Sequence, residues 1–303
     1  MGEVIIDITG NYTGEIAALS AALIWAIASS IYVAVGKQVP PLALNLAKGA
    51  IAIVLLSLTL ALRSMTFPDV PGWAIAVLLL SGAIGIGLGD TAFFTSLNCL
   101  GARRGLLLES LAPPITALIA LIALQEHLTL VAWTGIVLTV GGVAWVVVER
   151  TPSTPAFQLR PQRGIFFGVL AALGQASGAV LSRAALSGTD IDPLWSTLFR
   201  LLGGLLVLIV LITVQRQQHG LVILVRSRQL LITVAIAAFL GTYIAIWLQQ
   251  TALKFTEAGI SQALGATSPI FVIPIAVWMG DRISLRAIIG MAIALAGVWL
   301  LFS

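Results

Sequence analysis

The sequence predicts an all-α integral membrane protein, with ten transmembrane helices arranged as two inverted five-helix repeats around a central cavity. Of its 303 residues, 59% are hydrophobic and only 9% are charged, whereas a soluble globular domain has about 25% charged residues. The mean hydropathy is +1.07, so the chain has more apolar surface than a water-soluble fold can bury. These values predict a multi-pass protein of the cell (plasma or inner) membrane, with the lipid bilayer as its solvent.

The apolar stretches define the predicted helices. A helix needs about 20 mainly apolar residues to cross a hydrocarbon layer that is about 30 Å thick. The connections between the stretches are short and contain Gly, Pro or charged residues. Ten stretches satisfy the length requirement: residues 14–35, 41–62, 72–98, 104–124, 129–148, 164–186, 193–214, 229–253, 257–279 and 284–302.

One connection is longer and polar, and it divides the chain into two halves. Residues 149–163 (ERTPSTPAFQLRPQR) read as a linker. We therefore predict a first five-helix repeat in residues 1–150 and a second in residues 151–303. Because five is an odd number of crossings, the second repeat enters the membrane from the opposite side, which makes the repeats inverted.

Matching positions in the two halves support the repeat. An acidic residue is followed three positions later by a hydroxyl residue and then by two glycines. The same pattern, with the same spacings, recurs 155 positions further along the chain. The matched residues are Glu126 with Asp281, Thr129 with Ser284, Gly135 with Gly290 and Gly142 with Gly297. The glycines indicate close helix contact in the fifth and tenth helices.

The charges in the loops predict the orientation, because Lys and Arg are enriched in cytoplasmic loops. With a cytoplasmic N-terminus, the inner loops would contain only Arg63, Arg183 and Lys254, and all other loop cations would lie outside. We therefore predict that both termini are extracytoplasmic. Residues 1–15 contain no Lys or Arg, so no cleaved secretory signal is expected.

Several functional classes lack their sequence signatures. The chain has one cysteine, Cys99, which excludes an internal disulfide and a multi-cysteine metal site. It contains no His-Glu-x-x-His zinc motif and no phosphate-binding GxxxxGK[ST] loop. The sequence therefore predicts no enzyme, metal, cofactor or nucleic-acid partner.

Two basic residues within predicted helices are candidates for substrate binding. A charge at the bilayer centre costs at least about 2.5–3.5 kcal/mol, so charged residues are rare there and are commonly functional. Lys48 lies early in the second helix with Asn45 on the same face, and Arg200 lies at the corresponding depth of the seventh. Both cations would attract a carboxylate or phosphate. The alternative is that they extend to the nearby membrane interface.

Two acidic residues are candidates for the same reason. Asp90 follows a glycine-rich stretch in the third helix, and it would bind an amine, carry a coupling proton or pair with Lys48. Glu109 lies in the fourth helix shortly before Pro113, and it would bind an amine, carry a proton or pair with Arg104.

Neutral polar and aromatic side chains recur at helical spacing. They would line a polar cavity together, although any one of them could serve helix packing instead. The candidates are Trp25 and Tyr32 in the first helix, Gln175 in the sixth, Tyr243 and Trp247 in the eighth and Ser261 in the ninth. Among them, Trp25, Tyr243 and Trp247 would form the apolar wall.

The motifs around the fourth helix resemble those of a known family. Three motifs carry the resemblance: a small-residue turn (Gly101 to Arg104), Pro113-Pro114, and the ending Glu126-His127-Leu128-Thr129. The second half contains looser copies of them at Glu257-Ala258-Gly259, Pro269 and Asp281. In these features the chain resembles the EamA-type members of the drug/metabolite transporter superfamily. The chain departs from the family at Lys48, where Arg is frequent, and in its charge bias, since many members have a cytoplasmic N-terminus.

The resemblance implies a ten-helix inverted-repeat fold with a central cavity lined by the first four helices of each half. It places the fifth and tenth helices outside that ring. It also implies transport of metabolites, often export of amino acids or related compounds.

Together, these features predict a secondary transporter that exports small polar metabolites such as amino acids by alternating access, with the proton as a further partner. The mixed charges suit a zwitterion. One alternative is a channel or a non-transporting membrane scaffold. Another is an intramembrane aspartyl protease, since Gly87 to Asp90 matches GxGD, but that mechanism needs two carboxylates sharing a proton, and the other aspartates downstream fall in predicted loops.

Overall fold

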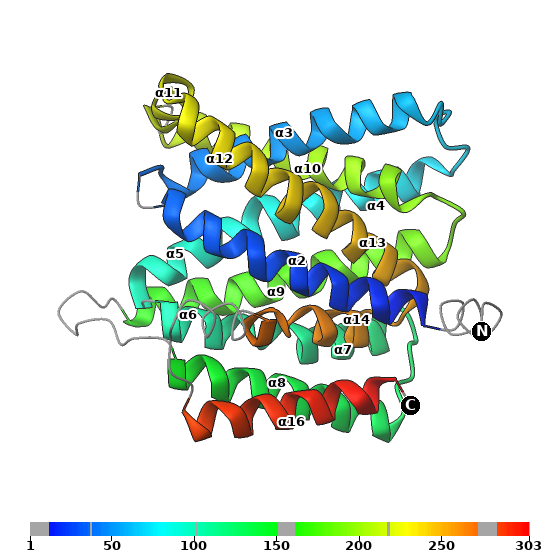
Figure 1. Ribbon diagram of the computed structural model, residues 1–303. Helices are drawn as coiled ribbons and strands as arrows, with labels where there is room; N and C mark the ends of the chain where they lie inside the picture. The colour runs from blue at the N-terminus through cyan, green and yellow to red at the C-terminus, as the bar shows by residue number, and fades with distance from the viewer. Residues whose placement is uncertain are drawn as a thin grey trace, which may run out of the picture.

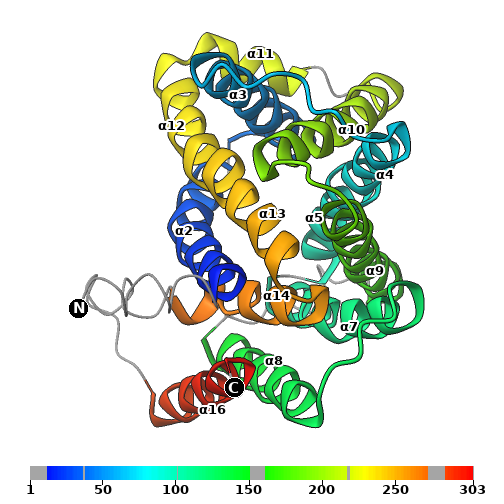
Figure 2. The same cartoon turned by 90° about the vertical axis from the view of Figure 1, so that its right-hand side faces the viewer.

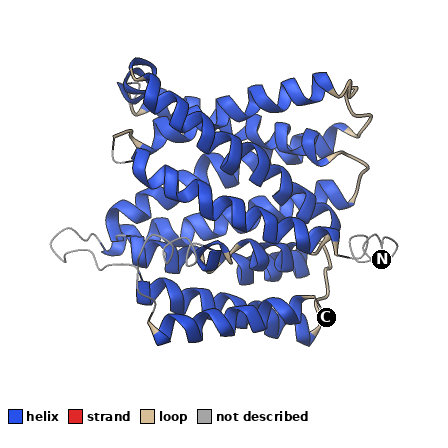
Figure 3. Ribbon diagram, in the orientation of Figure 1, coloured by secondary structure: helices blue, strands red, loops and turns tan. Residues whose placement is uncertain are grey.

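The described chain is helical (Figure 1). The computed structural model describes residues 12–36, 38–100, 102–150, 161–216, 219–271 and 284–302, and no β-strand occurs among them (Figure 3). The helices of the first repeat are α2 (Thr13–Gly36), α3 (Pro41–Leu62), α4 (Gly72–Gly82), α5 (Asp90–Leu100), α6 (Ala102–Glu109), α7 (Ala112–Ala123) and α8 (Leu130–Arg150). Those of the second are α9 (Pro161–Ser187), α10 (Pro193–Val214), α11 (His219–Arg226), α12 (Arg228–Ala238), α13 (Ala245–Phe255), α14 (Ala258–Gly265) and α16 (Leu285–Leu301).

The chain is confirmed as a multi-pass membrane protein by its long apolar helices. Seven helical segments within the described residues are long and apolar enough to cross a membrane. Two shorter apolar segments, Thr13–Ser29 and Leu285–Leu301, add to them. The predicted span 257–279 and Asp281 extend beyond the described residues, so the number of ten crossings stays a prediction.

Prolines fix the starts of the best-predicted helices. The bounds of α3 and α10 coincide with the predicted spans 41–62 and 193–214. Both begin with proline at the first helical position, where the missing N–H has no helical partner to lose. Asp192 also caps α10, because its Oδ1 accepts a hydrogen bond from Leu194 N at 2.8 Å.

The fourth predicted span, 104–124, is present as the apolar segment Gly105–Ala123, but its helix has an interruption that was not predicted. It divides into α6, which ends at Glu109, and α7, which begins at Ala112. Pro113 and Pro114 have no N–H to donate to the carbonyls of Glu109 and Ser110 four residues earlier. The break therefore follows from the proline pair, and it leaves Glu109 at a helix end inside the bundle.

The third helix of each repeat contains a π-helical segment that the sequence did not reveal. The segment η1 (Ala83–Gly89) joins α4 to α5, and η3 (Phe239–Ile244) joins α12 to α13. Both occur at equivalent places in the two repeats, and such segments are frequent at functional sites. Asp90 follows η1 directly. The short helix α11 before α12 was also not expected.

Equivalent helices of the two repeats run in opposite directions. A Cβ on Gly14, at the start of α2, would lie 1.9 Å from Thr256 Oγ1, just beyond the end of α13. At that same end of α13, Arg183 near the end of α9 donates to Leu253 O at 3.0 Å. The start of α2 and the end of α9 therefore lie at one end of the bundle, as in Figure 1. The rings of Tyr12 and Phe302 lie 5.4 Å apart, so both ends of the described chain are on that side.

The helices α8 and α16 pack against each other beside the ring formed by the remaining helices (Figure 2). A Cβ on Gly142 would lie 2.5 Å from Gly290 O, and one on Gly297 would lie 2.4 Å from Thr139 N. The glycines therefore permit backbone contact between the two helices, as predicted from their spacing. The ring surrounds the charged residues described below.

The hydroxyl of each acid-x-x-hydroxyl motif caps the helix that follows it. Thr129 Oγ1 accepts from Ala132 N, and Ser284 Oγ accepts from Ala287 N, both at 3.1 Å. We expect Thr129→Ala and Ser284→Ala each to lower the stability by about 1 kcal/mol, since a helix N-terminal donor loses its partner. Thermal unfolding in detergent measures this. Thr233→Ala is the control, because its exposed hydroxyl bonds only to Gln229 O within its own helix, and it should leave the melting temperature nearly unchanged.

Candidate functional site

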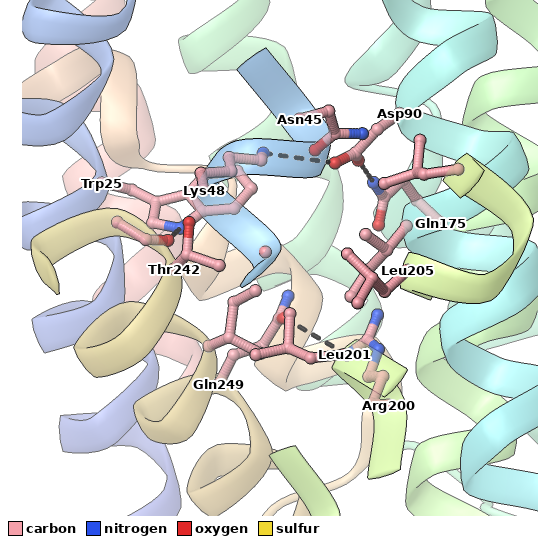
Figure 4. Close-up of a pocket in the computed structure, with 15 residues that line it drawn as sticks. Trp25, Asn45, Lys48, Asp90, Gln175, Arg200, Leu201, Leu205, Thr242 and Gln249 are labelled. Carbon is pink, nitrogen blue, oxygen red and sulfur yellow. Dashed lines mark hydrogen bonds and ion pairs between the residues drawn. The ribbon is translucent and has the colours of Figure 1, made fainter. Parts of the chain in front are cut away.

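Lys48 and Asp90 form an ion pair between the second and third helices of the first repeat. Lys48 Nζ on α3 lies 3.4 Å from Asp90 Oδ2 at the start of α5. Gln175 on α9 donates through Nε2 to Asp90 Oδ1 at 2.9 Å. Asp90 is thus held by one residue from each repeat (Figure 4). The alternative that Lys48 extends to the membrane interface does not fit this contact.

Two aromatic side chains of α2 face the same region. Lys48 Nζ lies 5.5 Å from the ring centroid of Tyr32, within reach of a cation–π interaction. Tyr32 Oη donates to Ala237 O at 2.8 Å, and Trp25 Nε1 donates to Gly241 O at 2.8 Å. These bonds fasten α2 to the second repeat at and beside η3.

Arg200 lies across the cavity from the ion pair, on α10 of the second repeat (Figure 4). It is the largest fully buried side chain among the described residues, 1% exposed. Its Nη1 donates to the neutral amide of Gln249 at 3.3 Å, and its buried Nε has no hydrogen-bond partner among the described residues. Gly85 leaves room for the guanidinium, because a Cβ there would lie 3.2 Å from Arg200 Nη2. No described carboxylate makes a salt bridge with Arg200.

A first cavity lies between Lys48, Asp90 and Arg200. Its volume is about 30 Å³, which is room for one or two water molecules. Both polar atoms of the buried Asn45 amide lack partners beside it. The charged lining comprises two cations and one carboxylate, so the cavity has an excess positive charge. The lining residues are Trp25, Asn45, Lys48, Gly49, Ile86, Asp90, Gln175, Arg200, Leu201, Leu205, Leu208, Gly241, Thr242, Ile246 and Gln249.

A second cavity adjoins the first and contains Glu109 and Ser261. Its volume is about 120 Å³. Trp25, Gln175 and Gln249 line both cavities. Glu109 Oε2 is buried and makes no hydrogen bond within the described chain. The side chain of Arg104, the intrahelical partner considered for Glu109, lies outside the described residues.

The structure places Tyr243 and Trp247 away from both cavities. Tyr243 Oη shares a hydrogen bond with Thr59 Oγ1 of α3 at 2.8 Å, and Trp247 packs against the apolar cluster of α3 and α10. The expected apolar wall therefore contains Trp25 from this set. The cavity side of this helix contains Thr242 and Gln249, which the sequence analysis missed. Thr242 directly precedes Tyr243 in the sequence, and periodicity alone does not tell which face turns inward.

Glu126 lies at the edge of the ring, where its carboxylate contacts several helix ends. Glu126 Oε1 accepts from Arg183 Nε at 2.6 Å, and Glu126 Oε2 accepts from Ala258 N at 2.9 Å. Arg183 Nη1 also donates to Leu253 O and to Lys254 O. This cluster joins the end of α7 to the ends of α9 and α13 and the start of α14.

The surroundings of Asp90 do not favour the protease alternative. The described lining of the first cavity contains no second aspartate, and the partners of Asp90 are an ammonium group and an amide. The glycines of its GxGD sequence provide helix contact instead, since a Cβ on Gly87 would lie 2.6 Å from Val207 Cβ.

Comparison with known proteins gives matches at the levels of family and fold. The sequence model of the EamA-like transporter family matches residues 12–148 and again residues 162–303. A solved structure described only as "Crystal structure of protein" has a TM-score of 0.77 and 15% sequence identity, with 96% of each chain covered. At this identity the likeness concerns the fold alone. No curated protein matches the chain.

Proposed function

The chain belongs to the EamA-like transporter family, and on that premise we propose that it is a secondary transporter of small polar metabolites with a carboxylate group, such as amino acids. We propose export as its direction, in line with the family resemblance of its motifs. The two repeats would expose one shared site alternately to the two sides of the membrane. Asp90 and Glu109 are the proposed sites for an amine or a coupling proton.

The observation that carries this proposal is that the buried Arg200 makes no salt bridge with any described carboxylate. A buried cation is strongly unfavourable unless it is paired and hydrogen-bonded. Here the guanidinium has only the amide of Gln249 as a partner in the described chain. A carboxylate entering the first cavity would supply the missing negative charge, and guanidinium and carboxylate form strong paired hydrogen bonds.

The size of the cavities supports a mechanism with conformational change. Ligand pockets commonly measure about 300–1,000 Å³, whereas the two cavities measure about 30 and 120 Å³. Binding would therefore require the repeats to separate locally. The walls that would move belong to different repeats, because α2 packs on α13 and α5 packs on α9. In alternating access, inverted repeats move against each other around a shared site, and the motion proposed here is of that kind.

The test is uptake of a labelled amino-acid panel into proteoliposomes, with Arg200→Gln beside the wild type. We expect the substitution to reduce the initial rate at least about tenfold, which corresponds to losing one charge-assisted contact. Thermal stability should be unchanged or higher, because an unpaired buried charge is removed. Arg63→Gln is the control, since Arg63 is exposed at the end of α3.

The outcome also separates the proposal from a channel or scaffold. A carrier gives saturable flux that accelerates when unlabelled substrate is present on the other side of the membrane. Flux without saturation would favour a channel. Full activity of a folded Arg200→Gln variant would remove the assigned role of Arg200.

A further inference from the structure

The second cavity contains a buried carboxylate for which the described chain offers no partner. Glu109 Oε2 is buried without a hydrogen bond, and no described salt bridge includes Glu109. Glu109 ends α6 at the break before α7. A carboxyl group buried in this way either pairs with a cation in its ionised form or holds a proton in its neutral form.

The other lining groups of this cavity favour a small organic cation. Glu109 is the one ionisable residue in its described lining, so the cavity has an excess negative charge when Glu109 is ionised. Trp25 adds an aromatic ring, which attracts cations. The hydroxyl groups of Ser261 and Ser268 supply further oxygen atoms, and oxygen acceptors suit the three N–H donors of an ammonium group.

Arg200 and Glu109, which make no salt bridge within the described residues, line different cavities that share a wall. Arg200 lines the first cavity and Glu109 the second, and Gln175, Gln249 and Trp25 line both. Asp90 is a poorer site for an ammonium group, because Lys48 already neutralises it. A ligand that satisfies both Arg200 and Glu109 must therefore extend from one cavity to the next.

We propose that the substrates are ω-amino carboxylates, in which a chain of several carbon atoms separates the carboxylate from the ammonium group. This inference rests on the proposed transport function and narrows its substrate class. The carboxylate binds Arg200 in the first cavity, and the ammonium group binds Glu109 in the second. An α-amino acid without a second amine has its two charges on one short head group and satisfies only one of the two residues.

Competition in proteoliposomes tests the charge separation. The probe is labelled 6-aminohexanoate, with glycine, 4-aminobutanoate and hexanoate as competitors. We expect 6-aminohexanoate to bind at least about tenfold more tightly than hexanoate, as one extra ion pair provides, and more tightly than glycine. Equal inhibition by glycine and 6-aminohexanoate would overturn the proposal.

The variant Glu109→Gln tests the residue assignment. This substitution should lower the affinity for 6-aminohexanoate to that for hexanoate, and it should leave hexanoate transport unchanged. The matched control is Glu257→Gln, which changes a half-buried glutamate outside both cavities. A retained preference for the amine in Glu109→Gln would overturn the proposal, as would equal loss of both substrates, which would indicate a proton site. If this variant does not fold, the ranking of competitors in the wild type decides.

Different results would contradict the proposed function and this inference. A wild-type protein that transports none of these carboxylates contradicts the function proposed for the Arg200 cavity and the substrate class with it. A protein that transports hexanoate and 6-aminohexanoate equally well contradicts only the role of Glu109.

Discussion

Replacing Gly82 with alanine is expected to abolish folding of the protein. Gly82 lies where α4 crosses α10, and a Cβ at this position would lie 1.7 Å from Arg200 O and 2.6 Å from Arg200 C. A carbon–oxygen contact needs about 3.3 Å, and the obstructing atoms are backbone, which cannot rotate away. Gly203 makes the reciprocal contact, since its Cβ would lie 1.9 Å from Leu79 O. The two helices would have to separate along the whole crossing.

The measurement is the yield of monodisperse protein in detergent, followed by thermal unfolding. Gly141→Ala is the matched control, because this helical glycine has no atom within 4 Å of the added Cβ. It should be tolerated and even stabilise the protein by about 0.5–1 kcal/mol, since alanine restricts the unfolded chain more than glycine. Recovery of Gly82→Ala with a wild-type melting temperature would contradict the close contact of α4 with α10.

The helix positions were predictable because few backbone structures can span a lipid bilayer. Every backbone polar group must be satisfied within the segment, so length and composition, together with the prolines at their starts, located α3 and α10 at their observed bounds. The opposite directions of the two repeats followed from the odd number of crossings. Local backbone departures were not predictable in this way. The sequence of η1 fits an ordinary helix as well as a π-helix, and its geometry depends on packing against α9 and α10.

The charged candidates were predictable for the same reason, since a charge in the hydrocarbon needs a specific partner. Lys48, Asp90 and Arg200 do line one cavity. The sequence left open which charges pair, because α3 and α5 belong to separate spans whose rotation is set by neighbouring helices. Gln249 was missed and Tyr243 was placed inward for this reason. Thr242 directly precedes Tyr243, so a one-position change of face exchanges these two residues without altering the periodicity.

Removal of either partner of the Lys48–Asp90 ion pair is expected to lower both stability and transport. Lys48→Met leaves the Asp90 carboxylate with only the amide of Gln175 as a partner, and Asp90→Asn leaves the Lys48 ammonium over the Tyr32 ring. Breaking one side of a fully buried pair costs about 3–5 kcal/mol, because the remaining charge is uncompensated; the loss here should be smaller, since the two side chains are 16% and 17% exposed. We expect each single variant to melt at a lower temperature and to transport no more than empty vesicles do.

The double variant Lys48→Met with Asp90→Asn separates a structural pair from a functional one. It has no unpaired charge, so its melting temperature should return close to that of the wild type. Transport should stay absent, because the pair joins α3 to α5 and, through Gln175, to the second repeat, and a site that opens and closes between the repeats must break and remake such a contact. If transport returned together with stability, the pair would serve folding alone. If both single variants transported normally, the assignment of the substrate site to this cavity would be wrong, and the fold would be unaffected.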